Sequence, residues 1–104
     1  MSVPAQSRAH QPVMVKVEAA VKPERLDEFL EMCKKGFPDT RAFDGCNTIQ
    51  AYLHEDGETL LEHWDSKEHY LNYHAWRSET GVIDAMAAFL HKPLDLSYFE
   101  TINA

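Results

Sequence analysis

Glycine, cysteine and basic residues are scarce in this chain, and each shortage excludes a class of protein. There are only four glycines, and none belongs to a Gly-rich loop of the kind that cradles a nucleotide, nicotinamide or flavin phosphate. The two cysteines, Cys33 and Cys46, lie too far apart for a Cys-x-x-Cys metal or redox pair. Lys and Arg number 10 against 17 Asp and Glu, for a net charge of −7, so nucleic acid and anionic membranes are poor partners.

Long hydrophobic runs are missing too. No apolar segment approaches the ~20 residues that cross a bilayer, and the first residues lack the apolar stretch of a secretory signal. We therefore expect a cytoplasmic protein without a membrane partner, in which both cysteines are reduced thiols.

The six histidines are spaced poorly for metal binding. Two ligands on one helix face need a separation of three or four residues, whereas His69 and His74 are five apart. The sequence therefore predicts no metal site.

The composition that remains is that of one soluble domain. The chain has 104 residues, of which 44% are hydrophobic and 26% charged, within the usual range for a single domain. Residues 1–12 are polar and include two prolines, so we expect a flexible tail there. Residues 13–104 form the single folded domain.

Alternating apolar and polar residues, the pattern of half-buried strands, predict four strands, at residues 13–21, 46–54, 59–64 and 94–101. An apolar stripe between Leu26 and Phe37 predicts a first helix that begins near Pro23 and is weakened or broken at Gly36 and Pro38. Two more helices are expected, at about residues 66–77 and 81–91.

Local signals place the start of the second helix and the turn between the central strands. Asp65 is expected to cap the helix, with Glu68 three residues on as its capping-box partner. Residues 55–58 contain an Asp-Gly pair, which predicts a hairpin between the second and third strands.

The predicted order β-α-β-β-α-α-β corresponds to an α+β, ferredoxin-like antiparallel sheet with helices on one face. The third strand, however, has apolar residues on both faces, with Leu60 and Trp64 on one and Leu61 on the other. Since the helices can cover only one face, this pattern predicts a second subunit on the other, and hence a homodimer.

Chemistry-bearing side chains are densest in residues 62–77, EHWDSKEHYLNYHAWR, which hold two tryptophans, two tyrosines and three histidines. Tyr70 and His74 are four residues apart and share a helix face, and Trp64 ends the preceding strand. Phenol and imidazole groups beside aromatic rings can bind a flat aromatic molecule and exchange protons with it. The alternative is that Trp64 and Trp76 are core residues and that Tyr70 only packs the helix on the sheet.

Residues 60–68, LLEHWDSKE, resemble the E-x-W-x-S-x-E signature of the antibiotic biosynthesis monooxygenase (ABM) family. The resemblance extends over about residues 13–100 and implies a dimeric α+β barrel, in which two ferredoxin-like sheets pack together and each has a pocket between its sheet and helices. Further matching segments are Val21-Lys22-Pro23, Asp44-Gly45-Cys46 and Tyr73-His74-Ala75-Trp76-Arg77 followed by Gly81.

The resemblance also implies an activity. Some members oxidise phenolic or anthrone-type polyketides, or quinols, with O₂ and no cofactor, so the leading hypothesis is a cofactor-independent monooxygenase acting on a hydroxylated aromatic, quinol or anthrone. Trp64 matches the family's pocket tryptophan and Tyr70 the tyrosine that would orient or deprotonate the phenol. His74 is the alternative base, since an imidazole titrates near ~6.5. The family's asparagine is replaced by Leu60, and Arg77 does not match its arginine.

Two alternatives stay open. One is a non-catalytic dimeric protein, either a binding protein or a stress-associated protein, that only holds a small aromatic ligand. The other is a haem-binding or haem-degrading relative, in which Trp64 and His74 would match that branch's tryptophan and histidine ligand.

Overall fold

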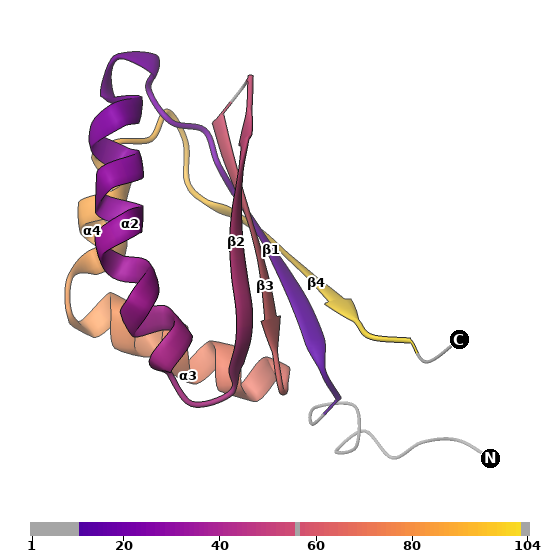
Figure 1. Cartoon of the computed structure of the whole chain (residues 1–104). Helices are drawn as coiled ribbons and strands as arrows, with labels where there is room; N and C mark the ends of the chain where they lie inside the picture. The colour runs from indigo at the N-terminus through magenta and orange to yellow at the C-terminus, as the bar shows by residue number, and fades with distance from the viewer. Residues whose placement is uncertain (1–10, 56, 103–104) are drawn as a thin grey trace.

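The computed structural model describes residues 11–55 and 57–102, apart from the side chains of residues 58 and 59. It contains one antiparallel sheet in the order β2-β3-β1-β4, the ferredoxin-like arrangement that the sequence predicts (Figure 1). Most of the predicted tail, and Asp56 of the predicted hairpin turn, lie outside the described residues. The strands are β1 (Val13–Ala19), β2 (Cys46–His54), β3 (Gly57–Trp64) and β4 (Asp95–Glu100).

The helices all lie on one face of the sheet (Figure 1). The other face of the sheet has no helices, and the sheet of the single chain is not closed into a barrel. The helical elements are the short 3₁₀ turn η1 (Pro23–Arg25) and the α-helices α2 (Leu26–Ala42), α3 (Lys67–Glu79) and α4 (Val82–Ala87).

Helix α2 runs on to Ala42, so the predicted break at Gly36 and Pro38 is wrong. Pro38 has no backbone N–H to donate within the helix. The carbonyl of Gly36 nevertheless accepts hydrogen bonds from Thr40 Oγ1, at 3.3 Å, and from Arg77 Nη2 on α3, at 2.8 Å. Pro38 removes only the donor to the Lys34 carbonyl, and the bonds at Gly36 tie this turn of α2 to α3, so tertiary contacts override a weak local preference.

Helix α3 is capped by Ser66, not by Asp65 as predicted. The Ser66 hydroxyl accepts from the His69 backbone N–H at 3.1 Å and lies 2.7 Å from His69 Nδ1. Ser66 has extended backbone angles and is buried, whereas Asp65 is exposed. The capping residue is thus the one that the fold turns inward, one position later than the prediction.

Helix α4 is shorter than predicted and ends at Ala87. The chain then turns back to β1, where Leu90 bridges Val21 and the Lys22 backbone N–H donates to the Phe89 carbonyl at 2.8 Å. The Phe89 carbonyl and the His91 backbone N–H therefore bond to Lys22 and Ala20, just after β1, instead of continuing the helix.

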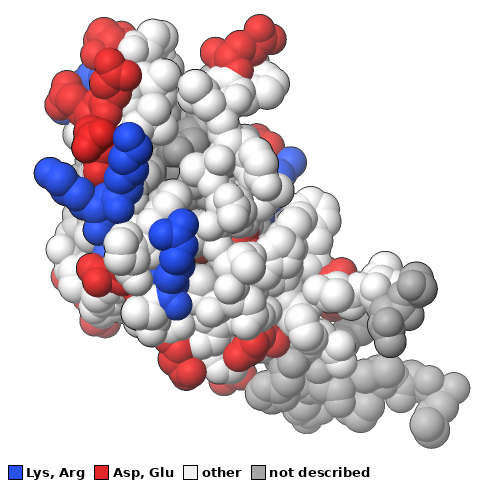
Figure 2. All heavy atoms as spheres, in the orientation of Figure 1, with Lys and Arg blue, Asp and Glu red and all other residues white. Residues whose placement is uncertain are grey.

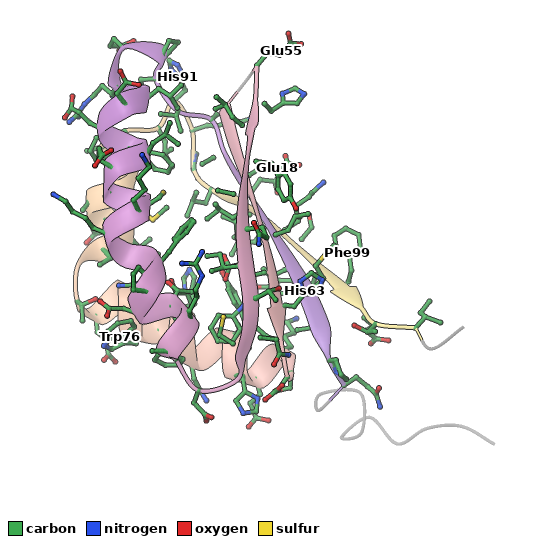
Figure 3. The ribbon with its side chains drawn as sticks, viewed as in Figure 1. Glu18, Glu55, His63, Trp76, His91 and Phe99 are labelled. Carbon is green, nitrogen blue, oxygen red and sulfur yellow. The ribbon has the colours of Figure 1, made fainter. Side chains whose placement is uncertain are left out.

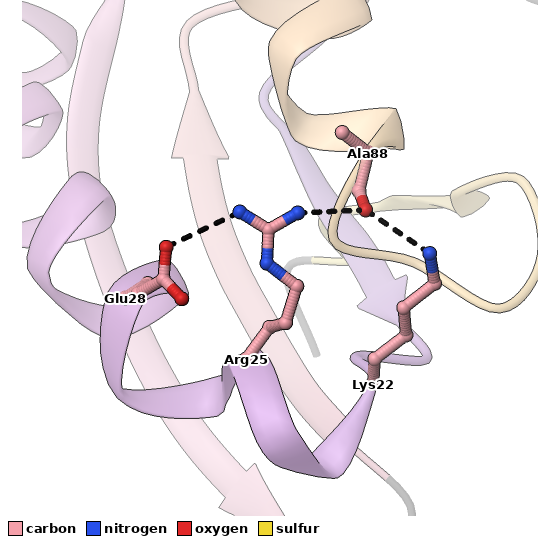
Figure 4. A network of polar contacts seen from close by, with 4 residues as sticks. All are labelled: Lys22, Arg25, Glu28 and Ala88. Atoms are coloured by element: carbon pink, nitrogen blue, oxygen red, sulfur yellow. Dashed lines mark hydrogen bonds and ion pairs between the residues drawn. The ribbon is translucent and has the colours of Figure 1, made fainter.

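Two cations close this end of the helix layer. Lys22 Nζ and Arg25 Nη1 both donate to the Ala88 carbonyl, at 3.3 and 3.4 Å, and Arg25 also pairs with Glu28 at 3.2 Å (Figure 4). The Arg25 guanidinium lies 4.1 Å from the centre of the Phe89 ring. Positive side chains are favourable at a helix C-terminus, so the network ties η1 to the end of α4.

The edge strand β2 is less buried than its alternation predicts. Ile49 is buried, but Ala51 and Leu53, which alternate with it on the same face of the strand, are exposed. A register shift between Cys46 and Thr48 marks an irregularity in its pairing with β3. Because β2 has a neighbouring strand on one side only, its far end receives little cover.

Two clusters of buried residues fill the space between sheet and helices. The first, called here the Phe29 core, consists of Ala19, Val21, Phe29, Cys33 and Leu90. The second, called here the Trp64 core, consists of Val13, Val15, Val17, Ile49, Leu60, Trp64 and Tyr70.

The face of the sheet without helices keeps large apolar side chains in solvent. Tyr52 is 53% exposed and Phe99 46% exposed, and Phe99 projects from β4 away from the helices (Figure 3). Acidic side chains gather elsewhere, over the N-terminal end of α2 and along the lower edge of the molecule (Figure 2). The face without helices carries the Lys16–Glu18 ion pair beside its apolar residues, with 2.9 Å between nitrogen and oxygen.

Candidate functional site

A cavity of about 280 Å³ lies between the sheet and the helices. Its size is near the lower end of the range for small-molecule pockets, roughly 300–1,000 Å³. Aliphatic residues from β1, β3, α2 and α4, including Val17, Leu60, Met32 and Met86, supply much of its wall. The polar side chains on the wall are Lys35, Thr40, Glu62, Tyr70, Tyr73, His74 and Arg77.

Glu62 is the buried carboxyl group of this cavity. Strand alternation places it between Leu60 and Trp64 on the helix-covered face of β3, and it is 3% exposed. Burial raises its pKa to about 7, although the Trp64 hydrogen bond and the Arg77 charge act in the opposite direction. The sequence prediction missed Glu62 as a site residue, although a carboxylate between two apolar residues of one strand face was the available signal.

Trp64 lies behind the cavity wall and supports it. It is fully buried and is not among the residues that line the cavity. Its indole Nε1 donates to Glu62 Oε1 at 3.1 Å, and its ring packs against Tyr70 and Tyr73 at centroid distances of 5.6 and 5.0 Å. Trp64 therefore fixes the position of Glu62 and of the α3 tyrosines.

Tyr70 and His74 both line the cavity, as their shared helix face suggests. Their ring centroids are 6.1 Å apart. Burial, with the charge of Glu62 as a smaller cause, raises the pKa of Tyr70 well above its usual range. At neutral pH this phenol is consequently a hydrogen-bond donor, a state suited to orienting a ligand.

Arg77 joins α3 to α2 at the cavity. Its Nε donates to the Tyr73 hydroxyl at 3.0 Å, and its Nη2 donates to the Gly36 carbonyl and to Thr40 Oγ1 at 2.8 and 3.0 Å. The Tyr73 and Thr40 hydroxyls lie 2.7 Å apart. The predicted site omitted Arg77 and Tyr73, although their spacing of four residues placed them on one helix face.

Arg77 and Glu62 lie on the wall of the same cavity, and the Arg77 charge lowers the pKa of Glu62 without a direct ion pair between the two described residues. Among the residues that the structure describes, no ion pair involves Arg77 or Glu62, yet both are buried and both line the cavity. A buried guanidinium held by neutral oxygens favours an anion nearby. The cavity thus offers a flat molecule apolar walls, a carboxyl group and a positive charge.

Metal and membrane sites find no support in the described part of the chain. There, no three His, Cys, Asp or Glu side chains gather closely enough to hold a metal ion. No helix in the same residues is long and apolar enough to cross a membrane. Cys33 and Cys46, both described, are not joined in a disulfide.

The fold and the cavity agree with a family match. The model of the antibiotic biosynthesis monooxygenase family matches residues 12–91, so the chain belongs to this family. No curated protein matches the chain.

Solved structures with the same fold are numerous and distant in sequence. A conserved protein from Methanosarcina mazei has a TM-score of 0.80 at 19% identity, covering 93% of this chain and 99% of its own. The ActVA-Orf6 monooxygenase of Streptomyces coelicolor, solved with nanaomycin D, has a TM-score of 0.70 at 18% identity, covering 92% and 91%. Rv0793 from Mycobacterium tuberculosis has a TM-score of 0.67 at 23% identity, covering 89% of this chain and 97% of its own. At such identities the likeness establishes the fold alone.

Proposed function

We propose that this protein is a cofactor-independent monooxygenase that oxidises a hydroxylated aromatic, a quinol or an anthrone with O₂. The observation that carries the proposal is the cavity itself, in which apolar walls surround a carboxyl group, a phenol, an imidazole and a guanidinium. Membership of the ABM family, and the fold shared with a monooxygenase that binds nanaomycin D, support the same reaction class.

The substrate supplies the electrons in this reaction. An anthrone loses both hydrogens of its methylene carbon and gains a carbonyl oxygen. One atom of O₂ enters the product and the other leaves as water, so one O₂ is reduced by four electrons from each substrate molecule. A deprotonated phenol or enol is electron-rich enough to react with O₂, and the protein has to position it and exclude water.

The cavity residues fit these tasks. The Tyr70 phenol can donate a hydrogen bond to a substrate oxygen, and His74 lies on the same wall as a proton-exchanging group. Arg77 provides a positive charge that favours the substrate anion. Trp64 acts from behind, because its ring and its indole N–H hold Tyr70 and Glu62 in place.

We further propose that the protein works as a homodimer formed through the sheet face without helices. Tyr52 and Phe99 leave large apolar surfaces exposed there, and the register places Met14 beside Phe99 and His63 in one row across the sheet. Light scattering at micromolar concentration is expected to give about twice 11.9 kDa. Phe99→Glu should yield monomer, whereas Leu71→Glu, at an exposed residue of α3, should not; a monomeric parent protein would contradict the dimer.

An oxygen electrode tests the reaction. A panel of quinols and anthrones is added to the protein, with heat-denatured protein as the control for autoxidation. We expect O₂ uptake above the control with at least one compound. For an anthrone, one O₂ is consumed per substrate and catalase returns none, because the second oxygen atom leaves as water. A quinol that is oxidised only to its quinone supplies two electrons, so it would release H₂O₂ instead. Binding without uptake across the panel would instead favour a non-catalytic protein that holds a small aromatic ligand.

A further inference from the structure

We propose that Glu62 is the proton acceptor of this cavity, and that it takes the hydroxyl proton of a phenol or of the enol form of an anthrone. This rests on the proposed function and adds a catalytic residue to it. In the step, the substrate O–H bond breaks, the proton moves to a Glu62 carboxylate oxygen and the electron pair stays on the substrate oxygen. No electron leaves the substrate at this point, and the proton is later available to the oxygen atom that departs as water.

The first argument is the way in which the carboxyl group is held. Trp64 Nε1 fixes Glu62 Oε1 at 3.1 Å, and Trp64 itself is fully buried and cannot turn away. No described residue bonds to the other carboxyl oxygen, yet no side-chain oxygen or nitrogen in the described chain is both buried and unpartnered. The second oxygen therefore faces the cavity that Glu62 lines.

The second argument is the state of the other candidate bases. Burial raises the pKa values of Tyr70 and Tyr73, and burial raises that of the Cys46 thiol to about 11, so all three stay protonated at neutral pH. Tyr73 is also occupied by its bonds to Thr40 and Arg77. By contrast, a carboxyl group with a pKa of about 7 is poised near the operating pH, where general bases are most effective.

The residues around Glu62 explain its raised pKa and include the other candidate base of the cavity. Apolar cavity residues from β1 and α4 account for the burial that dominates the shift. The other side chain on the wall that can exchange a proton is His74. The titratable or charged groups that face the cavity or Glu62 are Cys33 and Lys35 from α2, Cys46 from β2, and Tyr70, Tyr73, His74 and Arg77 from α3.

A binding experiment tests the assignment without requiring turnover. The probe is 2-naphthol, a flat fluorescent phenol that stays neutral between about pH 5 and pH 8, and 2-methoxynaphthalene is the matched ligand without an acidic proton. We expect 2-naphthol affinity to rise about tenfold over this range, with a midpoint near pH 7, because a carboxylate accepts a stronger hydrogen bond than a carboxylic acid. The methoxy compound should show no such rise.

Three variants assign the rise to one residue. Glu62→Gln keeps an oxygen that can accept from Trp64 Nε1 and should bind 2-naphthol with affinity that changes less than about twofold with pH. Glu62→Asp should retain a rise with pH, and His74→Asn should retain the full rise. A rise that persists in Glu62→Gln, a rise lost in His74→Asn, or 2-naphthol that does not bind at any pH would overturn the proposal; circular dichroism confirms that each variant is folded.

Failure of this proposal and failure of the proposed function give different results. If O₂ uptake is found but Glu62→Gln keeps the parent rate and pH profile, the oxidation stands and Glu62 is not the base. If no compound is oxidised but the pH-dependent binding disappears only in Glu62→Gln, Glu62 accepts the ligand's proton or hydrogen bond and the proposed oxidation is wrong.

Discussion

The Phe29 core and the Trp64 core lie between the same sheet and the same helix layer, yet they consist of different types of side chain. The Phe29 core has only aliphatic side chains, a cysteine and a phenylalanine, whose ring meets Phe89 edge-on at 5.8 Å. In the Trp64 core, the rings of Trp64 and Tyr70 pack 5.6 Å apart, and the adjacent Tyr73 ring packs against both, at 5.0 and 6.1 Å. A carboxyl group and a guanidinium are buried beside them.

This difference separates stability from chemistry within one small domain. A polar group costs free energy when it is buried, unless it is hydrogen-bonded. The Phe29 core avoids that cost, whereas the Trp64 core accepts it at Glu62 and offsets it with the Trp64 hydrogen bond. Buried titratable groups beside a cavity are typical of functional sites, so substitutions in the two cores should have opposite balances of stability and activity.

Truncation in the Phe29 core should have the largest effect. Phe29 is fully buried, and Phe29→Ala removes its ring and leaves a cavity with no polar group to attract water. We expect a loss of about 3–5 kcal/mol in the free energy of unfolding, a large share of the ~5–15 kcal/mol of a typical domain. Urea denaturation measures it; a loss below about 1 kcal/mol would mean that this core does not carry the stability of the fold.

Replacing the Glu62 carboxyl group with an uncharged side chain should raise the free energy of unfolding, and this effect should appear only above about pH 4.5. The pKa of Glu62 is about 7 in the folded protein against an ordinary 4.5, so its charged form is disfavoured by folding. The destabilisation is absent below about pH 4, grows as the pH rises from 4.5 towards 7, and is complete by about pH 8. The gap between the two pKa values corresponds to about 3 kcal/mol.

Glu62→Gln should therefore increase the free energy of unfolding by about 3 kcal/mol more at pH 8 than at pH 4. Urea denaturation of both proteins at both pH values measures the difference, and other carboxyl groups cancel because both proteins contain them. Glu79→Gln, at an exposed residue of α3, is the matched control and should show little of this pH dependence. Equal effects of Glu62→Gln at the two pH values would show that the carboxyl group titrates normally.

Thr40 tests the polar network that joins the two helices beside the Trp64 core. Thr40→Val keeps the side-chain shape and removes the hydroxyl that contacts Tyr73, Arg77 and the Gly36 carbonyl. Arg77 and Tyr73 keep the bond between them, so we expect a loss of about 1 kcal/mol. Thr101→Val, at an exposed residue just after β4, is the control; equal small effects would show that the network adds nothing to stability.

The sequence predicted much more of the fold than of the site. Alternation and helix spacing depend on nearest neighbours, and they indicated four strands, three helices and the stripe that includes Phe29 and Cys33. They could not indicate that Arg77 would bond to the Gly36 carbonyl on α2, because 41 positions separate the two residues. Ser66 was missed as the cap for a similar reason, since the fold decides which of two adjacent polar residues turns inward.

Only part of the candidate site was predicted, because helix spacing indicates which residues of one helix are neighbours but not which elements meet at a cavity. Tyr70 and His74 are close because they are four residues apart on one helix, and both line the cavity. Trp64 is adjacent but buried behind the wall. Predicting Glu62 as a site residue required the knowledge that the covered face of β3 borders a cavity. The position of Glu62 between Leu60 and Trp64 suggests this only when a carboxylate on a buried strand face is treated as a signal of function.

The smallest effect on stability should come from Tyr70→Phe, and it should have a large effect on function. The change keeps the ring that packs against Trp64 and Tyr98, at 5.6 and 5.9 Å, and removes only a hydroxyl that bonds to no described residue. We expect a stability loss of about 1 kcal/mol or less, because no partner in the described chain is left without its bond. Turnover, or affinity for a phenol, should fall by tenfold or more, since the donor to the ligand oxygen is gone.

His74→Ala should behave like Tyr70→Phe in stability, and it separates the two proton-exchanging groups of the wall. If Glu62 is the base, the variant keeps the acid limb of the pH–rate profile near pH 7 and loses only ligand affinity. Melting temperature and turnover are measured on the same preparations of both variants. If both variants melt clearly lower and turn over at the parent rate, Tyr70 and His74 are core residues, and the Trp64 core is no more a site than the Phe29 core.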